Sequence, residues 1–426
     1  MKFRRSSIRV LSDGRTSWKC PFREGGIEMS EDILPVTTEV LVWARERAGY
    51  SIDEAVAKAK IRAGRDGKSP EERLLSWESG ESAPTATQLK DLARIYFLPV
   101  ITFFLPSPPI EVSGLKDFRT IGNHRFTVSS PKFLALKLRI ESLHDTLKEI
   151  SEADPEPLVP FVGSLTMETP IEKAVETINS LIPWSVPVPA NLRTPRDAFN
   201  ELREKIQVLG VYVTLRGDLG SYHTQIQPSE FRGIAIADKI APLIVINPYD
   251  SDAAHVFTLI HEFVHILLGN SAISNLDDQI SQKYVKEELF CNSVTAEFLV
   301  PEKYLLQIIP EDIGSMDLQE FANEVAVIAK DFHVSRLVIA RKLKDLKYIN
   351  DSTYWTFYDS LAQAGKKSWE RGSRKGGPSA NVVAKYRLGE KLASRIIEAA
   401  DSGIISYSSA SYALNIKAGR FDKVMA

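Results

Sequence analysis

The chain has 426 residues, of which 44% are hydrophobic and 25% charged, and its formal net charge is −2. This length suits two or three globular domains, and the balanced charge excludes a nucleic-acid-binding protein that relies on overall basicity. Two cysteines exclude a disulfide framework and fit a reducing compartment. No apolar signal core follows the basic residues 1–5, and the most apolar tract, 95–105, contains Pro99 and is too short to span a bilayer. We therefore expect a cytoplasmic protein without a membrane segment.

The first part of the chain divides into an irregular segment and a helical domain. Residues 1–36 are expected to be poorly structured, with Met29 as an alternative start of the protein. Capping residues and glycine or proline breaks then predict a domain at residues 37–110, whose helices are 37–50, 51–62, 71–79 and 86–97. The second and third helices would form a helix-turn-helix, although residues 63–70 make its turn long and Glu71 and Glu72 would repel phosphates. Binding of DNA and binding of a protein partner both stay open.

A connector and a small sheet follow. The proline-rich residues 105–109 mark a boundary, and residues 111–194 are expected to be a helical connector. Its long helix, 131–152, has an apolar stripe that we interpret as packing surface against a neighbouring domain; the stripe is Phe133, Leu136, Ile140, Leu143, Leu147 and Ile150. A helix at 195–208 then precedes strands at 211–215, 233–237 and 243–247. These elements begin an α+β core at residues 195–347.

The most informative motif is His261-Glu262-Phe263-Val264-His265, inside the apolar run 256–268. Ser251 or Asp252 can cap this helix and Gly269 can end it. Positions i and i+4 share a helix face, so His261 and His265 can bind one cation, and Glu262 can take a proton from a water on that cation. The pattern is the HExxH motif of zinc-dependent peptidases, with a chance match as the alternative.

A catalytic zinc usually has three protein ligands and an open position. The next helical segment, 283–301, offers Glu287 and Glu288. Glu288 shares its face with Asn292 and Thr295, whereas Glu287 aligns with apolar positions, so Glu288 is the preferred third ligand. Asn292 is a candidate to orient a ligand imidazole through its ring N–H. Tyr222, His223 and His255 are candidate oxyanion stabilisers, while Cys291 fits a small buried apolar residue better than a fourth ligand.

These motifs together resemble the ImmA/IrrE family of metallopeptidases, which are bacterial and phage regulators with a thermolysin-like zinc site. The resemblance rests on the strand 241–248, on residues 257–265 and on 288–301, and the phrases at 77–80, 84–89 and 117–119 resemble the family branch with an amino-terminal Xre-type helix-turn-helix. It implies Zn²⁺ as cofactor and a repressor or other regulatory protein as the cleaved partner. We therefore expect a mostly helical α+β protein with an Xre-like domain, a thermolysin-like core and a carboxyl-terminal helical module.

The end of the chain offers basic surfaces. Residues 321–330 and 335–347 predict a second helix-turn-helix-like pair, and Arg336, Arg341 and Lys342 on its second helix are candidate nucleic-acid contacts. A packing helix with a solvated basic side is the alternative. Residues 348–426 are expected to hold a basic linker, around 366–391, and a helical module that includes 406–414.

Two hypotheses about function follow. The first is a zinc endopeptidase that cleaves a regulatory protein in transcriptional regulation, a prophage or a stress response. The alternative is a DNA-binding regulator, or a component of a toxin–antitoxin or phage-defence system, whose zinc site is structural or sensory. The sequence does not identify the substrate, the activating signal or the oligomeric state.

Overall fold

A computed structural model describes residues 36–64, 66–109, 116–117, 130–274, 282–370 and 379–425. The chain forms two compact units, residues 1–109 and 110–426, which are described separately. All but the last residue of the predicted irregular segment, 1–36, lies outside the described residues. None of the helices in the described ranges combines the length and apolar character needed to cross a membrane.

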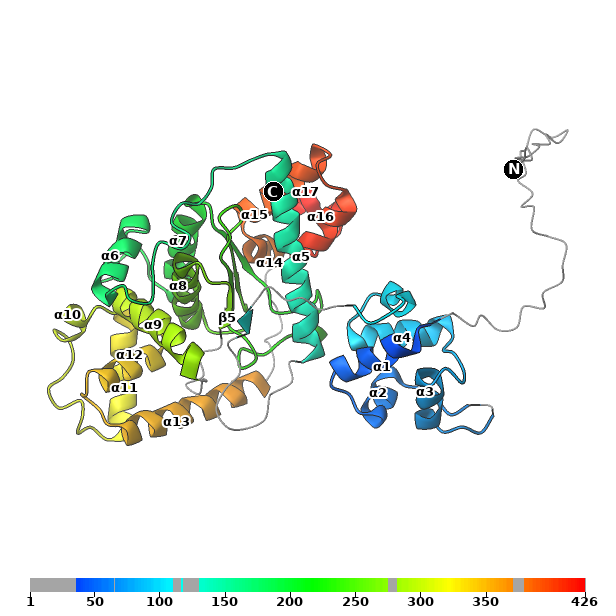
Figure 1. Cartoon of the computed structure of the whole chain (residues 1–426). Helices are drawn as coiled ribbons and strands as arrows, with labels where there is room; N and C mark the ends of the chain where they lie inside the picture. Colours follow the sequence, from blue (N-terminus) through cyan, green and yellow to red (C-terminus); the bar gives the residue numbers. More distant parts are fainter. Residues whose placement is uncertain are drawn as a thin grey trace, which may run out of the picture. The chain divides into compact units, whose positions relative to one another are not determined.

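The first unit is a cluster of short helices (Figure 1). They are α1 (Thr38–Arg47), α2 (Ile52–Ala59), α3 (Pro70–Glu78), α4 (Ala86–Tyr96) and the 3₁₀ helix η1 (Val100–Phe104). Each of the four predicted helices is present, and Ser51, Ser69 and Thr85 form capping boxes at the starts of α2, α3 and α4. A bidentate pair between Arg45 and Glu78, at 2.8 and 2.9 Å, joins α1 to α3. The likeness to an Xre fold stays a prediction.

The second unit is built on a five-stranded sheet with the order β1-β5-β3-β4-β2. Its strands are β1 (Lys116–Asp117), β2 (Tyr212–Leu215), β3 (Gly233–Ile236), β4 (Leu243–Ile246) and β5 (Ala272–Ser274). β2 runs parallel to β4, whereas β3 is antiparallel to both β4 and β5. The three predicted strands are present, and β1 and β5 were not predicted because they are only two and three residues long.

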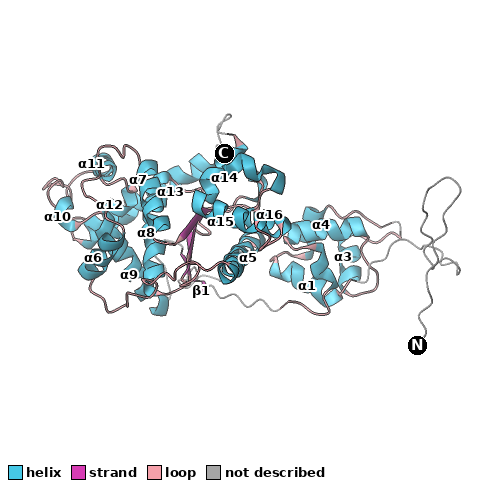
Figure 2. Ribbon diagram, turned by 90° about the horizontal axis from the view of Figure 1, so that it is seen from above, coloured by secondary structure: helices cyan, strands magenta, loops and turns pink. Residues whose placement is uncertain are grey.

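Helices cover both faces of this sheet (Figure 2). Alternate strand residues point to opposite faces: Val213, Ile244 and Ile246 pack with α8 (Asp252–Leu268), whereas Ile234 and Val245 pack with the other layer. That second layer contains α5 (Pro131–Ala153), α15 (Glu390–Asp401) and α16 (Tyr407–Leu414). Burial on both faces explains why these strands are almost continuously apolar.

The remaining helices complete the two layers. They are α6 (Ile171–Leu181), α7 (Pro195–Val208), η2 (Tyr222–Thr224), α9 (Gln282–Leu299), α10 (Glu302–Leu305), α11 (Leu318–Asp331), α12 (Arg336–Asp345), α13 (Asp351–Glu370), α14 (Ala380–Leu388), η3 (Ala418–Arg420) and α17 (Phe421–Met425). The apolar stripe of α5 therefore packs on the sheet of its own unit. Residues 111–194 and 348–426 belong to the same compact unit as 195–347. Within the predicted basic linker, residues 371–378 lie outside the described part.

Candidate metal centre

Helix α8 is capped at both ends. Ser251 Oγ accepts a hydrogen bond from the backbone N–H of Ala254 at 3.2 Å, and Gly269 ends the helix with φ of 72°. Nearly every residue between them is buried. This helix therefore carries His261, Glu262 and His265 through the interior, at the positions predicted from its sequence.

Helix α9 brings Glu288 against the two histidines. Its Oε2 lies 3.2 Å from His261 Nε2, its Oε1 lies 3.1 Å from His265 Nε2, and the two Nε2 atoms are 3.2 Å apart. All three residues are buried: His261 is 1% exposed, His265 0% and Glu288 2%. They form the one group of three or more candidate ligands found in the described ranges, with all ligand atoms within 4.8 Å of one another.

This donor set fits a zinc ion. Zinc binds imidazole nitrogen and carboxylate oxygen at about 2.0–2.2 Å, and two atoms bound tetrahedrally at that distance are about 3.4 Å apart. The separations of 3.1–3.2 Å are close to this value. Neither carboxylate oxygen of Glu288 has a hydrogen-bond partner among the described residues, although both are buried. A cation would offset the cost of burying that charge.

Glu287 contacts the other side of the His265 ring. Its Oε1 lies 3.4 Å from His265 Nδ1, and Cys291 Sγ lies 3.7 Å from the same nitrogen. A carboxylate there favours the Nδ1–H tautomer and leaves the Nε2 lone pair for a metal. Burial raises the pKa of the Glu288 carboxyl, but the two imidazoles outweigh it and hold that pKa below its ordinary value. Burial also raises the pKa of the Cys291 thiol to about 11, which suits an inert buried residue.

Glu262 is fully buried, and its carboxylate lies against the backbone of β3. A Cβ atom at Gly233 would lie 2.6 Å from Glu262 Cδ and 2.7 Å from Cγ, with Oε1 closer still. Only a glycine leaves room for this carboxylate. No sequence pattern indicates Gly233, because its importance depends on a contact between distant parts of the chain.

Asn292 and His255 have surroundings that differ from their predicted roles. Asn292 Oδ1 is buried without a hydrogen-bond partner among the described residues, and its side chain lines a small cavity between α9 and α12. The carboxylate that lies near an imidazole nitrogen is that of Glu287, at 3.4 Å from His265 Nδ1. His255 Nε2 lies 2.9 Å from the backbone carbonyl of Asn247, and burial lowers the pKa of its imidazole. His255 therefore ties α8 to the end of β4.

The other predicted residues lie outside the metal group. Tyr222 and His223 are in η2, where His223 is exposed and its carbonyl accepts a hydrogen bond from Lys132 at 3.0 Å. On α12, Arg341 pairs with Asp345 at 3.1 Å, Lys342 pairs with Glu297, and Arg336 is exposed. Because carboxylates neutralise Arg341 and Lys342, this face is less basic than its sequence indicates. Nucleic-acid binding stays a prediction.

A helix with the HExxH pattern and a second helix that supplies a carboxylate form the arrangement used by one class of metal-dependent peptidases. Residues 208–344 match the model of the Peptidase M78 family, described as the IrrE N-terminal-like domain. The matched segment contains strands β2–β5 and helices α8 and α9. It supports the ImmA/IrrE family and indicates a metallopeptidase-type domain. No curated protein and no solved structure matched the sequence at a significant level.

Proposed function

We propose that this protein is a zinc-dependent endopeptidase that cleaves a regulatory protein in the cytoplasm. The observation that carries the proposal is the convergence of His261, His265 and Glu288, with the buried Glu262 on the same helix as the two histidines. The match of residues 208–344 to a peptidase family supports the reaction class. The regulatory substrate, a repressor or similar partner, rests on the family resemblance.

Each residue has a defined task in this proposal. His261 and His265 hold the ion through Nε2 and Glu288 through its carboxylate, and Glu287 fixes the orientation of the His265 ring. The bound zinc ion would polarise the scissile carbonyl and lower the pKa of an attacking water. Glu262 accepts the proton of that water at its carboxylate and delivers it to the leaving amine. Gly233 keeps the Glu262 carboxylate in position.

A neighbouring cavity offers room for part of the substrate. It has a volume of about 120 Å³, and Phe257, Leu289, Tyr354 and Asn292 are among its lining residues. The Phe257 ring stacks near the His261 ring, with 6.2 Å between centroids, which puts the cavity next to the metal group. We propose that it accepts an apolar side chain of the substrate, and that the Asn292 Oδ1 atom accepts a hydrogen bond from the peptide backbone.

Substitution of the proposed base tests this function. Purified protein should contain about one zinc ion per chain, measured by mass spectrometry of the metal. Glu262→Gln should keep that zinc but lose cleavage of a proteome-derived peptide library by at least 100-fold, because the amide cannot accept the proton. Glu302→Gln, an exposed change on α10, serves as the control.

Cleavage by Glu262→Gln at the control rate would exclude the proposed mechanism. Full zinc occupancy without cleavage by the unsubstituted protein would instead favour the alternative in which the metal is structural or sensory. The same preparations can be tested for salt-dependent binding to DNA, which that alternative requires.

A further inference from the structure

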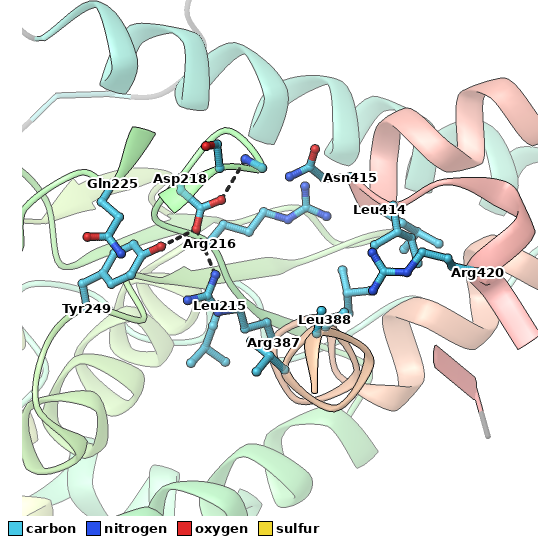
Figure 3. Close-up of a pocket in the computed structure, with 16 residues that line it drawn as sticks. Leu215, Arg216, Asp218, Gln225, Tyr249, Arg387, Leu388, Leu414, Asn415 and Arg420 are labelled. Atoms are coloured by element: carbon cyan, nitrogen blue, oxygen red, sulfur yellow. Dashed lines mark hydrogen bonds and ion pairs between the residues drawn. The ribbon is translucent and has the colours of Figure 1, made fainter. Parts of the chain in front are cut away.

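A second cavity lies on the side of β2 and β4 where both strands end (Figure 3). Its volume is about 460 Å³, which is within the range of small-molecule sites. The loops after β2 and β4 form one wall, and helices α14 and α16 with the following residues form the other. Arg216, Asp218, Tyr249, Arg387, Leu414 and Arg420 are among its lining residues.

The charged side chains of this cavity are mostly positive. Three arginines line it, and Asp218 is the one carboxylate among its described lining residues. That carboxylate is already engaged, because Asp218 Oδ2 accepts hydrogen bonds from the Tyr249 hydroxyl at 2.5 Å and from Arg387 Nη1 at 2.9 Å. Asp218 thus spends its hydrogen bonds on Tyr249 and Arg387, and in the described ranges Arg216 and Arg420 have no hydrogen bond to a carboxylate, although Asp218 still attracts Arg216 through space.

Arg216 is the most buried of the three arginines. It is 8% exposed, and its Nη2 donates a hydrogen bond to the backbone carbonyl of Ala413. Its Nε has no hydrogen-bond partner in the described ranges. Burial and the nearby Arg139 lower the pKa of its guanidinium to about 10, against the opposing effect of Asp218, so it remains charged at neutral pH. A buried guanidinium with an open donor is costly unless an anion binds it.

Arg420 adds a second donor across the cavity. Its Nε donates a hydrogen bond to Asn381 Oδ1 at 3.0 Å, which orients the guanidinium without cancelling its charge. Leu388 and Leu414 are among the apolar side chains that line the same cavity. The cavity therefore combines a cationic part with apolar surface.

We propose that this cavity binds a small organic phosphate. A phosphate monoester carries a charge of about −1.5 to −2 at neutral pH and three acceptor oxygens, which suits the guanidinium groups of Arg216 and Arg420. The apolar wall and the volume accommodate an organic body attached to the phosphate. The site is separate from the candidate metal centre and does not depend on peptidase activity.

Such a ligand would join two regions that are far apart in the sequence. Arg216 belongs to the loop at the end of β2, whereas Arg420 belongs to the carboxyl-terminal helices. Binding at both would favour the packed arrangement of these helices on the sheet. The ligand should therefore raise the thermal stability of the second unit as well as bind.

Calorimetric titration of the full chain tests the proposal, with AMP, pyrophosphate and inorganic phosphate as phosphate probes and succinate as a dicarboxylate. At least one phosphate probe should bind and raise the melting temperature. Arg216→Gln and Arg420→Gln should each weaken its binding at least tenfold. Lys423→Gln, which removes one exposed charge from the neighbouring helix α17, should change binding less than twofold.

The outcomes separate a site from general charge attraction. Failure of all phosphate probes to bind, or binding of succinate alone, would overturn the proposal. Equal weakening by Lys423→Gln would also overturn it, because it would mean that net charge decides the affinity. Circular dichroism checks that each variant is folded. Arg420→Gln carries the test if loss of the Arg216 bond to Ala413 prevents folding.

Discussion

Replacement of Gly233 by alanine should place a methyl group where the Glu262 carboxylate lies. The added Cβ would lie 2.6 Å from Glu262 Cδ, whereas carbon atoms in contact are normally about 3.5–4.0 Å apart. The carboxylate must therefore retreat by about 1 Å. Overpacking of this kind costs about 1–3 kcal/mol of unfolding free energy, and a 1 Å displacement of a catalytic group can lower the rate about 100-fold.

A double-mutant cycle measures this contact without a known substrate. Gly233→Ala alone should lower the unfolding free energy by about 1–3 kcal/mol in chemical denaturation. In a Glu262→Ala background the same change should cost less than about 0.5 kcal/mol, because the obstructing atoms are gone. Gly419→Ala is the matched control, since nothing lies within 4 Å of its added Cβ. Equal costs of Gly233→Ala in both backgrounds would refute the contact between Gly233 and Glu262.

Two further predictions concern Glu287 and His255. Glu287→Gln should weaken zinc affinity about 10- to 100-fold in competition with a chromogenic chelator, because the amide orients the His265 ring less strongly. The control Glu302→Gln should leave the affinity unchanged. Unchanged affinity in Glu287→Gln would contradict the role of Glu287. Burial lowers the pKa of His255, so the unfolded chain binds more protons and stability falls as pH decreases below about 6.5. His255→Gln should flatten this fall between about pH 6.5 and 5. His144, whose pKa is also lowered by burial, adds slope of the same sign, whereas His265, whose pKa is raised, opposes it. An unchanged denaturation profile would exclude a contribution from His255.

Local patterns were sufficient to predict much of the structure. The starts of α2 and α8 follow from the capping residues Ser51 and Ser251, whose bonds are made within one helical turn. The strands at 212–215 and 243–246 follow from short apolar runs. Helical spacing also separated Glu288 from Glu287, since only one of two adjacent residues can point at the ring nitrogens of both histidines.

Features that depend on contacts between distant residues could not be predicted. The contact of Glu287 with His265 joins two helices. The face of α9 that carries Glu287 looks apolar in the sequence, because Cys291 and Val294 lie on the same face. The bond from Arg216 to Ala413 spans nearly two hundred residues. The apolar stripe of α5 predicted a buried face correctly, but periodicity does not say which surface covers it.

Under the proposed function, the burial of the metal group would link zinc supply to the lifetime of the protein. His261, His265 and Glu288 join two core helices, so an ion that binds them binds only the folded unit. Free zinc at 100 times the dissociation constant would add about 2.7 kcal/mol to the unfolding free energy. Depletion of zinc would therefore expose the second unit to degradation, and the cellular amount of the protein would follow the availability of the metal.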